Sequence, residues 1–251
     1  MSVERIALVT GANQGVGLEV ATKLAANGVT VYLGSRDLAR GEAAAAGIPT
    51  GATAIQIDVT DPVSIAAAAE RIRAEHGRLD LLVNNAGISN TRTGSLTPEE
   101  MAASATAGIA SLFEVRAIWD VNVFGVLAVY QAMLPLLRAS SDARIVNVSS
   151  AVGSLAMNAD PDFPYRTAYG PGYAASKTAE NAITLAMMIE LEQTDIKINL
   201  VSPGFTSTAL NNFAGTESIE DGSREVVRVA LLGPDGPTNT FTRWEDTAIP
   251  W

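Results

Sequence analysis

The chain has 251 residues, of which 47% are hydrophobic and 18% charged, so it can bury the core of one large α/β domain. A formal net charge of −10 without clustered Lys or Arg argues against nucleic acid as a partner. There is no cysteine, which excludes disulfides, thiolate catalysis and Cys-ligated zinc and fits a cytoplasmic protein. The one histidine, His76, is expected to be a solvated helix-end residue, so neither a Ser-His-Asp triad nor a metal site is expected.

Short apolar runs alternate with segments of helical length along the chain. The first kind predicts strands at Arg5–Val9, Thr30–Leu33, Ala54–Ile57, Leu79–Val83, Arg144–Val148 and Lys197–Val201. The second kind predicts helices at Leu18–Ala26, Leu38–Ala46, Val63–Glu75, Ile118–Leu137 and Ala174–Glu192. The strands are hydrophobic on both faces, as in a buried parallel sheet. The alternation therefore predicts a Rossmann-type, doubly wound α/β fold with helices on both faces of the sheet.

No internal repeat or charged linker divides the chain, so we expect a single domain over residues 1–251. We find no secretory signal and no run of about 18 apolar residues, and we expect no membrane association. Three stretches are expected to form the substrate site, at about 88–116, 153–172 and 205–240, because ligands of open α/β sheets bind beyond the carboxyl ends of the strands. The alternative is that these are surface loops without a ligand.

A glycine-rich turn, in which Gly11, Gly15 and Gly17 are spaced Gly-x-x-x-Gly-x-Gly, follows the first strand and opens the first helix. Glycine permits a tight turn and lets backbone N–H groups approach a pyrophosphate at the positive end of a helix. The sequence therefore predicts a dinucleotide-binding turn. Its expected contacts are Gly11, Asn13, Gln14, Gly15, Val16 and Gly17.

Arg36 stands at the end of the second strand, 19 residues beyond Gly17, where such a fold meets the adenosine ribose. An acidic residue there would bind the 2′-hydroxyl of NAD, whereas an arginine can clamp the 2′-phosphate of NADP. Arg36 therefore favours NADP over NAD as the cofactor. The neighbouring Asp37 complicates this prediction, since it could either cap the next helix or approach the ribose.

Tyr173 and Lys177 open a long helical segment, and a spacing of four places both side chains on one face. A tyrosine titrates near pH ~10, too high for easy proton exchange at neutrality, but a neighbouring ammonium favours its phenolate. Such a tyrosine can donate a proton to a carbonyl oxygen or take one from an alcohol. The chain has few lysines, which makes a chance pairing at this spacing less plausible.

These motifs, taken in order from Ile6 to about Thr208, resemble the short-chain dehydrogenase/reductase family. The resemblance implies seven parallel strands, hydride transfer at an alcohol or carbonyl carbon, and assembly into homodimers or homotetramers. It implies that Tyr173 and Lys177 are the catalytic acid/base pair, that Ser150 polarises the substrate oxygen and that Asn122 holds a water beside the lysine. It adds further cofactor contacts at Asp58, Val59, Asn85, Ala86, Gly87, Tyr173, Lys177, Pro203, Gly204, Thr206 and Thr208.

Several of these positions also have a structural interpretation. Asp58 could cap the helix that starts near Pro62, and Asn84 could tie neighbouring strands together. Ser150 could cap the turn in which it stands, and it is favoured over Ser149 because the family's Ser-x-x-Gly pattern then reaches Gly153.

The chain departs from the family pattern in two regions. Ser150 and Tyr173 are 23 residues apart, which is longer than usual, and the stretch before Asn122 is also extended. Both insertions resemble those of carbonyl-reductase-like members and leave the oligomeric state open. The C-terminal segment 233–251 lacks the usual glycine-rich motif, although Asn239–Trp244 could supply a strand.

The sequence therefore predicts NADPH-dependent reduction of a ketone or aldehyde. An apolar substrate pocket is indicated by Phe163, Tyr165, Phe205, Phe213 and Trp244. Three alternatives remain: an NAD-linked alcohol dehydrogenase, an NAD-linked epimerase or dehydratase, and a non-catalytic NADP-binding redox sensor. A sensor would be expected to lose the catalytic residues, which this chain keeps.

Overall fold

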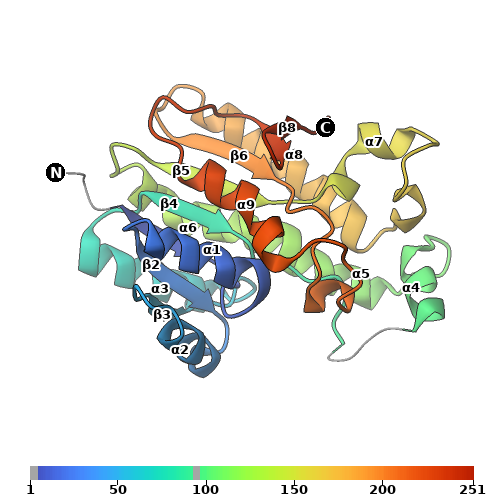
Figure 1. Cartoon of the computed structure of the whole chain (residues 1–251), viewed down its shortest axis with the longest axis horizontal. Helices are drawn as coiled ribbons and strands as arrows, with labels where there is room; N and C mark the ends of the chain where they lie inside the picture. The colour runs from blue at the N-terminus through green and yellow to red at the C-terminus, as the bar shows by residue number, and fades with distance from the viewer. Residues whose placement is uncertain (1–4, 93–96) are drawn as a thin grey trace.

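One sheet organises the part of the chain that the computed structural model describes, residues 5–92 and 97–251 (Figure 1). Its strands are β1 (Ile6–Val9), β2 (Thr30–Ser35), β3 (Thr53–Gln56), β4 (Leu81–Asn84), β5 (Arg144–Val148), β6 (Lys197–Val201), β7 (Phe241–Arg243) and β8 (Thr247–Ala248). They lie in the order β3-β2-β1-β4-β5-β6-β7-β8. The first seven are parallel, which confirms the expected fold, and β8 pairs antiparallel with β7. The sequence did not predict β8, because two exposed residues leave no periodic pattern.

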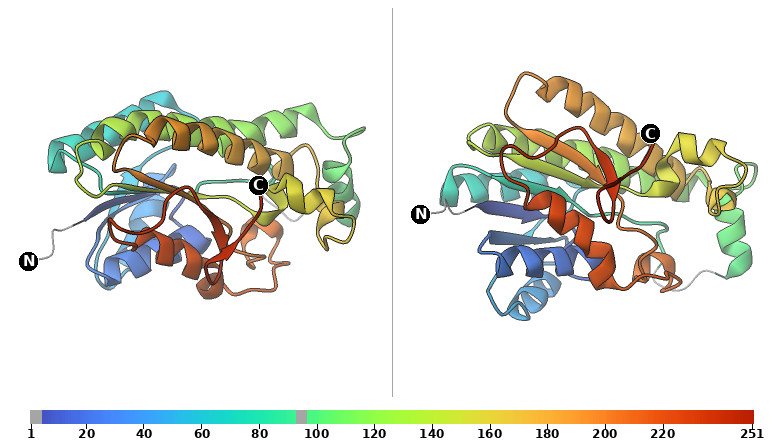
Figure 2. Two further views of the ribbon diagram at one scale, coloured as in Figure 1. Left: turned by 90° about the horizontal axis from the view of Figure 1, so that it is seen from above. Right: turned by 45° about the horizontal axis from the view of Figure 1, so that its top comes forward.

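Helices cover both faces of this sheet, as Figure 2 shows. One face carries α3 (Pro62–His76), α6 (Val126–Leu137) and α8 (Tyr173–Leu191), and the other carries α1 (Gly15–Ala26), α2 (Leu38–Ala46) and α9 (Ile219–Ala230). Successive residues of β1 point to opposite faces, as a strand requires. Leu8 packs with the α3 and α6 side, whereas Ala7 and Val9 pack with the α1 and α9 side. Because both faces of the sheet are buried, the sequence of each central strand consists mostly of apolar residues.

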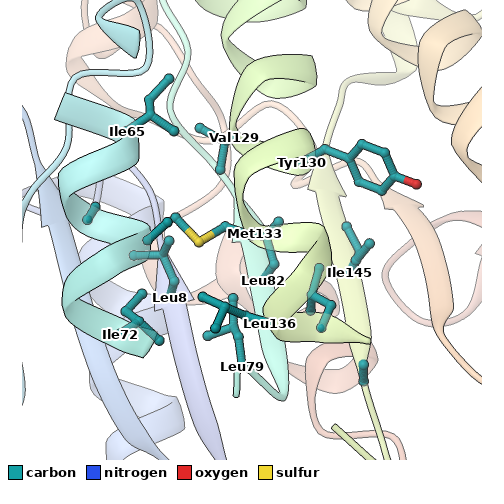
Figure 3. Packing of buried hydrophobic residues seen from close by; sticks show 14 of the residues in the cluster. Leu8, Ile65, Ile72, Leu79, Leu82, Val129, Tyr130, Met133, Leu136 and Ile145 are labelled. Atoms are coloured by element: carbon teal, nitrogen blue, oxygen red, sulfur yellow. The ribbon is translucent and has the colours of Figure 1, made fainter. Parts of the chain in front are cut away.

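Figure 3 shows the core on the α6 side of the sheet. Leu8, Leu82 and Ile145 come from three neighbouring strands, and Met133 of α6 lies among them with Ile72 of α3. The central strands are thereby held rigidly between two helical layers. Their carboxyl ends provide a fixed platform for the loops that follow.

The long helix predicted at Ile118–Leu137 is part of a longer helical run, Leu112–Leu137. This run comprises α5 (Leu112–Trp119), a π-helical segment η1 (Asp120–Gly125) and α6. By length and composition alone, with a mean hydropathy of 1.5, the run could cross a membrane. Half of that apolar window is buried inside the protein, as in the core helix of a soluble protein, so this is weak evidence for a membrane.

The three stretches expected as loops contain further helical elements. These are α4 (Pro98–Ala105), the start of α5 at Leu112, α7 (Leu155–Ala159), η3 (Arg166–Ala168) and η4 (Ala209–Asn211), while η2 (Ala151–Gly153) ends where the second stretch begins. In Figure 1, α4 and α7 lie beyond the carboxyl ends of the central strands. Residues 93–96, within the first stretch, lie outside the described residues.

The expectation of a loop over 205–240 is wrong for α9, which packs against α1 and contributes Val226 and Val229 to the core. Gly222 weakens the helical signal in its sequence. The structure explains this residue, because a Cβ there would lie 2.0 Å from Oγ1 of Thr206.

Candidate active site

The turns after β1, β4, β5 and β6 all emerge at the carboxyl edge of the sheet. The order of strands reverses between β1 and β4, because the chain builds outward first through β2 and β3 and then through β5 and β6. In an open α/β sheet this reversal opens the crevice in which ligands bind. Most of the predicted site residues lie on these turns, so the topology brings together segments that are far apart in the sequence.

The glycine turn after β1 packs closely against the Asn85-Ala86-Gly87 turn after β4. A Cβ on Gly11, which has a φ of +62°, would lie 2.8 Å from Cα of Ala86. The Asn85 side chain donates from Nδ2 to the carbonyl oxygens of Thr10 at 2.9 Å and Gly11 at 3.1 Å. The Thr10 hydroxyl accepts from the backbone N–H groups of Asn85 and Ala86 at 3.0 and 3.1 Å. The two turns therefore form one rigid unit.

The N-terminus of α1 is suited to an anion. Within the described part of the chain, Gln14 at the N-cap makes no side-chain capping bond, and no acidic residue stands in the first turn. Backbone N–H groups and the positive end of the helix dipole are thus left for a ligand. A Cβ on Gly15 would lie 3.7 Å from Cγ2 of Thr208, so the segment after β6 also borders this turn. The cradle fits the pyrophosphate of a dinucleotide.

Arg36 is exposed directly after β2, while its neighbour Asp37 is engaged elsewhere. The Asp37 carboxylate accepts from the N–H of Arg40 at 3.1 Å and caps α2, so of the two interpretations of Asp37 the structure supports the cap. The Ser35 hydroxyl donates to the Asp37 carbonyl oxygen at 2.7 Å and tightens the same turn. Arg36 thus keeps its guanidinium exposed at the place expected for the adenosine ribose.

Asp58 does not cap the following helix, so that alternative was wrong. Asp61 caps α3 instead, accepting from the N–H of Val63 at 2.9 Å. The Asp58 carboxylate accepts from both the N–H and the hydroxyl of Thr60, at 2.9 and 2.7 Å. Its neighbour Val59 is buried in the core.

Tyr173, Lys177 and Ser150 meet beside the carboxyl end of β5. Part of the Tyr173 side chain is exposed, but its phenol hydroxyl is buried and is hydrogen-bonded by the Ser150 side chain. The Nζ atom of Lys177 lies 5.9 Å from the centroid of the Tyr173 ring. The predicted pairing on one helix face is therefore realised at the start of α8.

Gly153 brings Ser150 to Tyr173. A Cβ on Gly153 would lie 2.8 Å from the carbonyl carbon of Lys177, so only glycine lets η2 pack onto the backbone of α8. Ser150 makes no side-chain capping bond to η2 among the described residues, which argues against its interpretation as a cap. Ser149 points into the core, where its hydroxyl donates to Oδ1 of Asn181 at 2.6 Å. The structure thus places Ser150 rather than Ser149 on Tyr173.

Burial raises the pKa of Tyr173 above its ordinary value of 10.0. The Lys177 ammonium and the Ser150 hydrogen bond act in the opposite direction, but a buried carboxylate, Glu180, adds to the rise. The sequence predicted the effect of Lys177 with the right sign. It did not predict that burial and the charge of Glu180 raise the pKa of Tyr173 by more than Lys177 lowers it.

The buried Asn122 side chain is tied to the turn after β4. Its Oδ1 accepts from the N–H of Ile88 and its Nδ2 donates to the Ile88 carbonyl oxygen, each at 2.9 Å. The second N–H of the amide donates to the Ser176 hydroxyl at 3.0 Å. Both amide protons are therefore used within the protein, and only a lone pair on Oδ1 remains for a water.

The segment after β6 is held largely by its own contacts. The Thr206 hydroxyl donates to the Pro203 carbonyl oxygen at 2.7 Å and is buried, so its proton is not free for a ligand. Gly204 has a φ of +74° and is exposed. Thr208 borders the glycine turn, as described above.

Two features of the site were missed by sequence reasoning. Glu180 forms a buried ion pair with Lys177, and its position three residues further along the helix was a detectable signal. The second feature is a row of hydrogen-bonded polar side chains below the site. The sequence predicted only its link between strands at Asn84. There Asn84 donates to Asn147 at 2.9 Å, and Asn147 donates to Thr184 at 2.8 Å, so it joins two strands to α8.

Three of the five aromatic residues expected around the substrate lie together. The Tyr165 ring lies 5.8 Å from that of Phe163 and 5.7 Å from that of Phe205, centroid to centroid. The other two do not join them: Phe213 is 66% exposed, and Trp244 packs against Arg224. The loops over 153–172 and after β6 thus share one aromatic cluster, which we call the aromatic trio.

The chain resembles known proteins over nearly all of its length. A family profile described as short chain dehydrogenase matches residues 5–218. Short-chain dehydrogenase anuI from Penicillium roqueforti is 35% identical over 250 residues, 96% of this chain and 93% of that protein. The structure of salutaridine reductase from Papaver somniferum matches with a TM-score of 0.78 at 28% identity, covering 95% of this chain and 99% of that one. A metagenomic short-chain oxidoreductase in complex with NADP matches with a TM-score of 0.74 at 27% identity, covering 97% and 99%.

Proposed function

We propose that this chain, which belongs to the short-chain dehydrogenase family, reduces a ketone or aldehyde with NADPH. The observation that carries the proposal is the meeting of Tyr173, Ser150 and Lys177 at the carboxyl end of β5. This end of the sheet lies next to the cradle between β1 and β4. A proton donor and a dinucleotide site are therefore neighbours, as a carbonyl reduction requires.

The residues that would hold the cofactor follow the carboxyl edge of the sheet. The turn from Gly11 to Gly17 and the first N–H groups of α1 would bind the pyrophosphate. Arg36 would bind the 2′-phosphate that distinguishes NADP from NAD. Its exposed position supports this role, and so does the capping role of Asp37, since the Asp37 carboxylate is oriented toward the start of α2. The NADP complex of a similar oxidoreductase supports the same preference.

Bound NADPH would supply a hydride to the carbonyl carbon, and the protein would supply the proton. The Ser150 hydroxyl and the Tyr173 phenol would each donate a hydrogen bond to the carbonyl oxygen and stabilise the negative charge that develops there. The carbonyl oxygen would take the Tyr173 proton, and the product would be an alcohol. Lys177 would then stabilise the resulting phenolate. The raised pKa of Tyr173 favours this direction, because reduction needs the protonated phenol and oxidation needs the phenolate.

Asn122 would support the site by fixing the turn that carries Ile88. A water beside Lys177, which the family pattern implies, could use only the remaining lone pair of the Asn122 side chain or another group of η1. The aromatic trio at Phe163, Tyr165 and Phe205 would form one wall of an apolar substrate pocket. A cytoplasmic location and a homodimer or homotetramer remain predictions.

The test is purified protein with NADPH or NADH against a panel of aldehydes, ketones and diketones, followed by the loss of nicotinamide absorbance. We expect oxidation of NADPH well above that of NADH, and a loss of about 10²- to 10⁴-fold in Tyr173→Phe. Tyr169→Phe is the matched control, since Tyr169 precedes α8 by four residues and its hydroxyl contacts only Thr178 among the described residues. Full turnover in Tyr173→Phe would contradict the proposal. Cofactor binding without turnover of any substrate would favour the redox sensor instead.

A further inference from the structure

The ammonium of Lys177 is held by two acceptors inside the protein. Its Nζ donates to the carbonyl oxygen of Val148 at 2.8 Å and to Oε2 of Glu180 at 2.6 Å. The Lys177 side chain is 4% exposed and that of Glu180 is fully buried. A carboxylate so deeply buried is costly unless it is paired, so Glu180 depends on Lys177 as its partner.

No other charged group takes part in this arrangement within the described residues. The elements packed against α8 carry Glu114 and Arg116 on α5, Asp120 on η1, Arg144 on β5 and Lys197 on β6. The charges that act on Tyr173 are those of Lys177 and Glu180, and the charge that acts on Glu180 is that of Lys177. The second oxygen of Glu180, Oε1, has no hydrogen-bond partner among the described residues. The Glu180 carboxylate therefore forms an ion pair with Lys177 and with no second cation among the described residues.

We propose that Glu180 is a positioning residue that fixes the Lys177 ammonium and offsets its charge, so that Tyr173 keeps its proton and acts as a proton donor for reduction. This inference rests on the proposed role of Tyr173. Lysine alone would present a full positive charge to the phenol. The Lys177–Glu180 pair presents no net charge, whichever of the two groups holds the shared proton.

The charges of Lys177 and Glu180 determine in which direction the pKa of Tyr173 changes when Glu180 is replaced. Burial lowers the pKa of Lys177, but the interactions of Lys177 with Glu180 and with Tyr173 together outweigh burial and raise the pKa, so Lys177 keeps its ammonium charge. Removing the negative charge of Glu180 leaves a net positive charge near Tyr173, which stabilises the phenolate. The phenol should then ionise at a lower pH. Each unit of that shift changes the phenolate fraction about tenfold in the range where the phenol dominates.

The first test needs no substrate. Ultraviolet absorbance of phenolate is titrated in the wild-type protein and in Tyr173→Phe, and the difference isolates Tyr173 from the other four of the five tyrosines. We expect Tyr173 to ionise above pH ~10 in the wild-type protein. Ionisation below about pH 9 would overturn the inference, because Lys177 would then act without an offset.

The second test changes the charge alone. The same titration in Glu180→Gln, with and without Tyr173→Phe, should place the midpoint at least about one pH unit lower. Glu190→Gln is the matched control, since Glu190 lies on the same helix, is half exposed and contacts Arg138 and Tyr130. An unchanged midpoint in Glu180→Gln would overturn the inference. Circular dichroism establishes whether the variant folds, and if it does not, ionisation of wild-type Tyr173 below about pH 9 would still overturn the inference.

Kinetics separate this inference from the proposed function. In Glu180→Gln, the alkaline limb of kcat/KM for carbonyl reduction should move to lower pH by the shift seen in the titration, while Glu190→Gln keeps the wild-type profile. A merely structural role of Glu180 would lower activity at every pH without moving the limb. If no carbonyl is reduced at all, the proposed function fails, yet the titration still reports the charge balance at Tyr173.

Discussion

The side-chain amide of Asn85 lies so close to Gly17 that a Cβ on Gly17 would be 2.3 Å from its Nδ2 atom. The same Cβ would lie 2.7 Å from the carbonyl oxygen of Gly11. Asn85 uses this Nδ2 to hold the turn after β1. The close approach therefore joins the start of α1 to the turn after β4.

We predict that Gly17→Ala lowers the free energy of unfolding by about 1–3 kcal/mol, because either Asn85 or the turn must move. NADPH binding should weaken as well, since the N–H groups at the start of α1 lose their alignment. Thermal unfolding and nicotinamide fluorescence measure the two effects. Gly108→Ala is the control, since nothing lies within 4 Å of a Cβ at that position. Wild-type affinity in Gly17→Ala would show that this turn does not hold the pyrophosphate.

Arg36→Ala should weaken NADPH binding by about 10- to 100-fold, because a charge-assisted hydrogen bond to a phosphate contributes about 1.5–3 kcal/mol. NADH binding should change little, since it has no 2′-phosphate. Titration with each cofactor measures the ratio of the two dissociation constants. Arg73→Ala is a suitable control, because Arg73 is an exposed arginine of α3 that pairs with Glu70. Equal loss for both cofactors would mean that Arg36 does not recognise the 2′-phosphate.

Asn122→Ala should cost about 1–3 kcal/mol of stability, since it leaves two partly buried backbone groups of Ile88 without this partner. Turnover should also fall, because the turn beside Lys177 loses its anchor. Urea unfolding, monitored by circular dichroism, tests the first effect. Asn27→Ala serves for comparison, as Asn27 is exposed and bonds only the Lys23 carbonyl through its side chain among the described residues. A loss no larger than that of Asn27→Ala would argue against this anchoring role.

Tyr165→Ala should raise KM for large apolar ketones by about five- to tenfold, because the aromatic trio loses its central ring. Small ketones should be affected less, since they do not reach this wall of the pocket. The comparison of KM across ketones of increasing size provides the measurement. Trp244→Ala is the control, because Trp244 packs on Arg224 and not on the trio. A uniform change across all sizes would place the trio outside the substrate pocket.

The parallel sheet and most of its helices could be predicted because they depend on local sequence. A strand buried on both faces must be apolar throughout, and Ile6–Val9 shows this pattern directly. The missed elements have local causes as well. Gly222 interrupts the pattern of α9, and β8 is only two residues long.

The sequence also determined that Tyr173 and Lys177 share a helix face, because a spacing of four in an α-helix fixes that geometry. Only the tertiary structure decided how the two groups behave. Burial depends on β5, η2 and α8 packing together, and it turns the expected fall in the pKa of Tyr173 into a rise. Glu180 is one turn away on a helix wheel, yet its charge matters only because folding removes water from both it and Lys177. Spacing along a helix is a local property, whereas the strength of a charge depends on everything that surrounds it.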